Sequence, residues 1–169
     1  MNAKHLTILF ITIPCIFLRA EAIGQDTVIR PSITEITDEL RSENQLHLGN
    51  PVGYAAIPET NNKYFKLFTC LKSIATTSEL FQLAKDSSNM IKLYSYLILV
   101  ERSDSSVKHI FLQNIHNHST VWVASGCTGI LLQVNHFMLS RIQPGLPESM
   151  KLLTAKEYKH YRKLVGLKH

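Results

Sequence analysis

The hydrophobic pattern of the chain centres on residues 89–100, NMIKLYSYLILV, in which Lys92 is the only charged side chain. A helix at the surface would show a single apolar stripe, whereas this segment is apolar nearly all round, which predicts a buried helix. The segment is shorter than the roughly 20 residues that span a bilayer. We therefore expect a central helix that packs between other elements.

One-sided patterns flank this central segment. Residues 78–84 and 105–115 each place their apolar side chains on one face, which predicts two amphipathic helices. Ser78 is predicted to cap the first of them, and Ser105 or Ser106 the second. The links to the central helix are polar turns of four residues, and such short links favour antiparallel neighbours.

Three more helices are predicted towards the ends of the chain. The first begins within residues 32–35, with Ser32 or Thr34 as its cap, and the second follows residues 58–60. The last is capped by Thr154 and carries basic residues opposite an apolar side. Their apolar positions recur at helical spacing: Ile33, Ile36 and Leu40 in the first; Tyr64, Leu67, Phe68, Leu71 and Ile74 in the second; Tyr158, Tyr161, Leu164 and Val165 in the last.

The pattern is ambiguous at residues 121–134, VWVASGCTGILLQV, which are rich in β-branched side chains and are interrupted by two glycines. The segment is either extended or a helix start followed by a glycine-loosened turn. Trp122 is either a core residue or part of an exposed binding edge. An indole is usually mostly buried in a domain of this size, which favours the core.

The N-terminus has the pattern of a secretory signal peptide. Lys4 precedes an apolar run at 6–18, and Ala-Glu-Ala at 20–22 supplies the small residues of a cleavage site. Arg19 departs from this pattern, and an uncleaved anchor is the alternative. We expect cleavage after Ala22 and export to the periplasm or the extracellular space, with no stable membrane span in the processed chain.

Composition agrees with a folded chain. Hydrophobic residues make up 45% of the 169 residues and charged residues 18%, which is close to the globular average. The predicted organisation is a signal peptide at 1–22, a flexible leader at 23–31 and a single α-helical domain at 32–169. The formal net charge is +5, and the basic residues of the chain are concentrated near the C-terminus. A solvated helix face explains these basic residues better than a nucleic-acid partner does. We therefore predict no nucleic-acid partner.

The last helix also offers a candidate partner surface, formed by Tyr158, Tyr161 and Arg162. Tyrosines beside basic residues are typical of a face that meets a protein or a membrane surface. Docking of these tyrosines onto the helical body is the favoured interpretation.

Two cysteines, Cys70 and Cys127, follow the signal peptide. In an oxidising compartment they could form a disulfide, and two separately buried thiols are the alternative. His116, His118 and Cys127 could also serve a metal- or thiol-dependent enzyme of the cell envelope. No metal-binding spacing accompanies them, so solvated loop histidines are favoured. We assign no catalytic residue, no metal ligand and no cofactor.

Residues 50–142 show a spacing of helix, polar turn, helix and a glycine–cysteine pair. The positions that carry this spacing are Glu79, Leu80, Leu83, Ile91, Lys92, Tyr94, Tyr96, Leu97, Gly126 and Cys127. In this spacing the segment resembles the HEAT-like helical repeats of small exported bacterial proteins of unknown function. It implies a mainly α fold, a compact helical domain with HEAT-like antiparallel helix packing, and it transfers no activity.

Helical-repeat surfaces bind other proteins along a groove or a face. The function expected from the sequence is therefore that of an exported, non-catalytic protein-binding module, such as an adaptor, an inhibitor or an immunity-type factor. The identity of the partner protein does not follow from the sequence.

Overall fold

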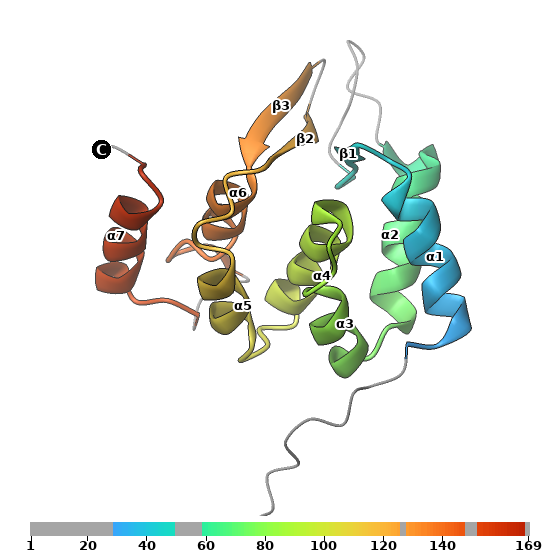
Figure 1. The fold of residues 1–169 in the computed structure, drawn as a ribbon, viewed down its shortest axis with the longest axis horizontal. Helices are drawn as coiled ribbons and strands as arrows, with labels where there is room; N and C mark the ends of the chain where they lie inside the picture. The colour runs from blue at the N-terminus through green and yellow to red at the C-terminus, as the bar shows by residue number, and fades with distance from the viewer. Residues whose placement is uncertain (1–28, 50–58, 126–127, 148–151, 168–169) are drawn as a thin grey trace, which may run out of the picture.

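The structure is a computed structural model, and it describes residues 29–49, 59–125, 128–147 and 152–167. Within these residues it is mainly α-helical, as predicted, with one small sheet (Figure 1). The elements are α1 (Pro31–Arg41), β1 (Gln45–Leu46), the 3-10 helix η1 (Glu59–Asn61), α2 (Lys63–Ile74), α3 (Thr77–Leu83), α4 (Asn89–Glu101), α5 (Val107–Gln113), β2 (Thr120–Ser125), β3 (Thr128–Gln133), α6 (Val134–Ser140) and α7 (Ala155–Leu164).

The central helix is confirmed as α4. Every side chain at positions 93–100 is buried, and the helix contacts α1, α3, α5, α6 and β1. A helix that is apolar all round is stable only when other elements cover all of its faces. The apolar run at 89–100 therefore becomes the centre of the core.

Two tyrosines of α4 satisfy their polar ends inside this core. The Tyr96 hydroxyl donates to the Met138 carbonyl of α6 at 3.1 Å, and the His47 backbone N–H donates to the Tyr94 hydroxyl at 2.9 Å. Burial raises the pKa of the Tyr96 hydroxyl well above its ordinary value. These bonds tie α4 to α6 and to the segment that follows β1.

Helix starts agree with the predictions in part. Thr154 caps α7 in a capping box with Glu157, as expected for this residue type. The predicted cap of α3 is wrong, because the helix begins at Thr77 and its cap is Thr76, not Ser78. Ser106 precedes α5, but its hydroxyl donates to Asp104 and makes no cap hydrogen bond.

The predicted cap of α1 is wrong as well. The helix begins at Pro31, and neither Ser32 nor Thr34 caps it. Arg30 occupies the capping position and makes no side-chain cap hydrogen bond. Proline suits the first turn of a helix because its missing N–H would have no partner there, and its fixed φ is already helical.

A three-stranded sheet is the element that the predicted fold class lacked. The strand order is β1-β2-β3, with β1 parallel and β2–β3 antiparallel. Of the two alternatives for 121–134, the extended one is therefore confirmed for most of the segment, while α6 begins at its end. The hairpin lies at one end of the helical body, beyond α6 (Figure 1).

Several predictions concern residues that the structure does not describe. The signal peptide at 1–22 and most of the leader at 23–31 lie outside the described residues, as does Cys127. Across the described ranges, no helix has both the length and the apolar content needed to cross a membrane. HEAT-like packing stays a prediction.

Candidate protein-binding surface

The β2–β3 hairpin is built from side chains that favour strands. Val121 and Val123 lie on the face towards the helical body and are 6% and 4% exposed. Because side chains alternate along a strand, Trp122 between them points to the opposite face, where it is 46% exposed. Trp122 was predicted to be a core residue, and this prediction is wrong.

Trp122 lies beside another exposed apolar side chain on the outer face of the hairpin. It lies directly opposite Leu131 in the antiparallel register, and Leu131 is 50% exposed. A Cβ atom at Gly129 would lie 2.8 Å from Cε3 of Trp122, so the indole covers the glycine of the neighbouring strand. An aromatic ring over a cross-strand glycine protects the backbone there and fixes the position of the ring.

Exposure extends to the other face of β3. Ile130 lies opposite Val123, which is 4% exposed, yet Ile130 itself is 48% exposed. We call Trp122 and Leu131, which share the outer face, the apolar hairpin surface. The other large exposed apolar side chains of the described residues are scattered over separate elements: Ile74, Leu112, Leu146 and Leu164.

The hairpin surface is also free of charge. Between Lys108 and Arg141 the sequence contains no aspartate, glutamate, lysine or arginine. Clustered apolar side chains without charge are typical of surfaces that contact another protein, whereas single exposed apolar residues are common and carry no such meaning.

Polar side chains hold the base of the hairpin. The Val134 N–H donates to the Ser119 carbonyl at 2.8 Å, and the Asn135 amide donates to the Ile115 carbonyl at 2.9 Å. His118 Nδ1 lies 3.2 Å from Oε1 of Gln133. These contacts join the two ends of the hairpin to the turn after α5.

The residues of the alternative enzyme site are only partly described. His116 and His118 are both exposed around the turn that leads into β2, as loop histidines, while Cys127 lies outside the described residues. Within the described ranges, no group of three or more histidine, cysteine, aspartate or glutamate side chains is placed to hold a metal ion. The enzyme alternative thus stays a prediction.

The disulfide also stays a prediction. Cys70 is exposed on α2 and forms no disulfide with any described residue, and its predicted partner Cys127 is not described.

The tyrosines of α7 face the helical body. The rings of Tyr161 and Phe111 meet edge to face with 5.4 Å between their centroids, and the Tyr158 hydroxyl donates to Gln143 at 3.3 Å. Both tyrosines and Arg162 are half-buried. The two tyrosines were expected to dock onto the helical body in this way. A partner surface at Tyr158, Tyr161 and Arg162 stays a prediction.

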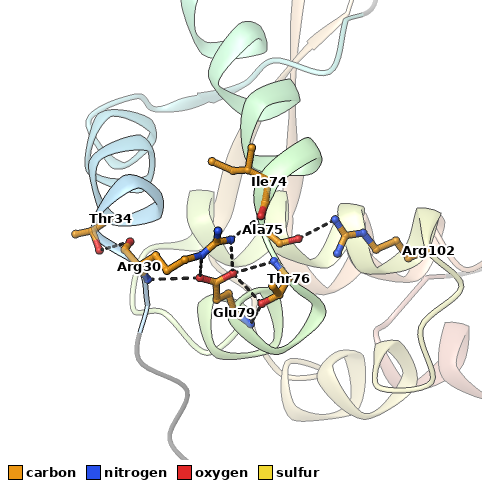
Figure 2. A network of polar contacts seen from close by, with 7 residues as sticks. All are labelled: Arg30, Thr34, Ile74, Ala75, Thr76, Glu79 and Arg102. Atoms are coloured by element: carbon orange, nitrogen blue, oxygen red, sulfur yellow. Dashed lines mark hydrogen bonds and ion pairs between the residues drawn. The ribbon is translucent and has the colours of Figure 1, made fainter.

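A polar network joins the start of α1 to the link between α2 and α3 (Figure 2). Glu79 is 2% exposed, and its carboxylate accepts from Arg30 Nε at 2.7 Å and from the Thr76 N–H at 2.8 Å. Arg30 also donates to the Ile74 carbonyl at 2.6 Å, and Arg102 donates to the Ala75 carbonyl at 2.9 Å. Two arginines therefore meet the last carbonyls of α2, where a helix favours positive charge.

The network belongs to the fold rather than to a binding site. Its hydrogen bonds from Arg30, followed by those from Thr76, lower the pKa of the Glu79 carboxyl well below its ordinary value. The carboxylate is thus ionised and fully occupied by partners from the chain itself.

Comparisons of the chain with protein-family models, with curated proteins and with solved structures found no match. The resemblance to HEAT-like proteins therefore stays a prediction from the residue pattern.

Proposed function

We propose that this protein is an exported, non-catalytic protein-binding module that contacts its partner through the outer face of the β2–β3 hairpin. The observation that carries the proposal is the pair of exposed, cross-strand side chains Trp122 and Leu131. Hiding such a pair from water provides binding free energy in proportion to the apolar area removed.

The chemistry of the hairpin indicates the kind of partner. Tryptophan is enriched among the residues that dominate binding energy, because its large ring fills a pocket at little cost in side-chain entropy. The indole of Trp122 is already held over Gly129, so binding need not order it. A partner protein with an apolar pocket or groove of low charge would fit this face.

This role is compatible with an adaptor, an inhibitor or an immunity-type factor. All three act by non-covalent contact and need a stable scaffold that presents one face. The buried α4 at the centre of the helical body supports such a scaffold.

A capture experiment with matched variants tests the proposal. The purified protein is immobilised and exposed to a cell-envelope and secreted-protein extract of the cells that produce it. Trp122→Ser and Leu131→Ser should each lose the retained partner, because truncation of a central apolar anchor costs about 2 kcal/mol or more, roughly thirtyfold in affinity.

Leu164→Ser is the matched control, since Leu164 of α7 is 49% exposed and lies on a different element. It should retain the same partner as the wild type. Circular dichroism and thermal unfolding of each variant establish that the fold is intact. Retention of the same proteins by the wild type and both hairpin variants would contradict the proposal, as would the absence of any retained protein.

A further inference from the structure

The outer edge of β3 raises a separate question from the face of the hairpin. Among the described strands, β3 lies last in the sheet and pairs only with β2. Monomeric proteins usually block such an edge with lysine, proline, an inward charge or a bulge, because unpaired N–H and C=O groups bind other strands. The sequence TGILLQ contains no charged residue and no proline.

We infer that the edge of β3 pairs antiparallel with β3 of a second copy of this chain. The inference goes beyond the proposed function, which concerns the face of the hairpin and not its edge.

Charge favours a second copy as the occupant. In a two-fold interface every surface meets its own copy, so a charged surface meets like charge. Like charges opposite one another in a sheet are destabilising. The uncharged stretch at 109–140 avoids this repulsion, whereas α7 carries Lys156, Lys159 and Lys163 on exposed positions.

Antiparallel pairing keeps the two faces of the strand separate. An antiparallel two-fold axis stands perpendicular to the sheet, so each residue of β3 lies opposite a residue from the same face. Every antiparallel register meets this condition, and we choose the one that places Leu131 opposite its own copy for its apolar contacts. It extends the existing Trp122–Leu131 pair into one apolar row that runs across both copies.

The position of the hairpin sets how the two helical bodies lie in this pairing. The C-terminal end of β3 leads directly into α6, and the hairpin projects from one end of the body (Figure 1). Antiparallel pairing therefore places the two helical bodies towards opposite ends of the joined strands. One six-residue edge buries less surface than a standard interface, so we expect a weak dimer with a dissociation constant on the order of tens of micromolar.

Sedimentation velocity of the purified protein, from low to high micromolar concentration, tests the inference. The wild type should change from monomer to dimer over this range. Ile130→Lys places a charge on the edge strand without touching the Trp122 face, and it should weaken dimerisation by roughly tenfold or more. Leu164→Lys, the same kind of change at an exposed leucine of α7, should dimerise as the wild type does.

A wild type that stays monomeric at the highest concentration would overturn the inference. So would an Ile130→Lys variant that is folded and dimerises as tightly as the wild type.

Hydrogen exchange of the wild type gives a second readout that does not depend on a variant. Amides of β3 should exchange more slowly at high protein concentration than at low concentration, while those of α4 should not change. A dimer without added protection in β3 would place the interface elsewhere and overturn the inference.

The capture experiment separates this inference from the proposed function. Ile130→Lys should still retain the partner protein that Trp122→Ser loses. If Ile130→Lys also loses that partner, then a foreign strand occupies the edge and the inference of a second copy is wrong. A monomeric wild type that still retains a partner through Trp122 would leave the proposed function intact.

Discussion

Glu79 and Ser95 are both buried polar side chains, but their surroundings differ. Glu79 accepts hydrogen bonds from Arg30 and Thr76 (Figure 2), whereas the Ser95 hydroxyl has no hydrogen-bond partner among the described residues. Burial of a polar group costs free energy unless a hydrogen bond replaces its contact with water. Substitution of these two residues should therefore have opposite effects on stability.

Ser95→Ala should raise the free energy of unfolding by about 1 kcal/mol, because it removes a buried hydroxyl that lacks a partner and changes little else in α4. Urea denaturation monitored by circular dichroism measures this change. Ser73→Ala on the exposed side of α2 serves as the control and should stay within about 0.5 kcal/mol of the wild type. A loss of stability in Ser95→Ala would contradict the assignment of an unpartnered hydroxyl.

Glu79→Gln should lower the free energy of unfolding at neutral pH by about 2 kcal/mol, because the charged acceptor of the Arg30 guanidinium is lost. The pKa of Glu79 is lower in the folded chain than in the unfolded chain. Its contribution is therefore fully present above the unfolded pKa of about 4.3 and is lost as the pH falls towards the folded pKa.

Denaturation between about pH 7 and about pH 3 should consequently show the wild type and Glu79→Gln converging at the acid end. Glu35→Gln, on the exposed side of α1, provides the control for removal of one surface charge and should cost less than about 0.5 kcal/mol at neutral pH. A difference between wild type and Glu79→Gln that stays constant down to the lowest pH would contradict the role of the ionised carboxylate.

At the scale of elements, α4 and the hairpin show how a sequence pattern leads to a position in the fold. The pattern of α4 could be interpreted directly, because a helix that is apolar on all sides has no stable place except the interior. The hairpin was ambiguous because two glycines interrupt its β-branched run, and glycine fits both a strand and a loosened turn.

The exposure of Trp122 did have a signal in the sequence. Val121 and Val123 flank it, and strand alternation places both valines on one face and the indole on the other. The general tendency of tryptophan to be buried outweighed this alternation in the prediction. The absence of charge from 109 to 140 is a second signal, visible in the sequence alone, that marks the hairpin surface.

Gly129→Ala tests the contact that holds the hairpin surface together. Its Cβ atom would lie 2.8 Å from Cε3 of Trp122, so the indole must move away from β3. Because Trp122 is the only tryptophan in the chain, its fluorescence reports this movement alone. We expect stronger quenching by acrylamide and a red-shifted emission, with a change in stability below about 1 kcal/mol because the ring is half-exposed. Unchanged quenching would contradict the packing of indole on glycine.

At the scale of the whole molecule, contacts between distant segments were the least predictable part of the fold. Arg30 and Glu79 are 49 positions apart, and the pairing of β1 with β2 joins segments separated by most of the helical body. No local pattern encodes such pairs, since many charged residues could partner one another. The cap of α1 also differs from its prediction, because Arg30, and not a serine or threonine, precedes the first turn.

The whole molecule combines a buried interior with an exposed apolar surface on the hairpin. Buried side chains of the helices from α1 to α6 and of the sheet form one core, and α7 packs against it through its tyrosines. The apolar hairpin surface, Trp122 and Leu131, extends beyond that core. We propose that another protein binds at this surface.

Fluorine NMR of protein labelled with 5-fluorotryptophan tests that claim most directly, because the chain contributes one resonance and it comes from Trp122. The partner retained in the capture experiment is added unlabelled, at a protein concentration low enough to keep the chain monomeric. We predict that the resonance shifts or broadens in proportion to the partner bound, and that it loses its sensitivity to exchange of H2O for D2O. A resonance that stays unchanged while the partner binds would show that binding occurs elsewhere and would contradict the account.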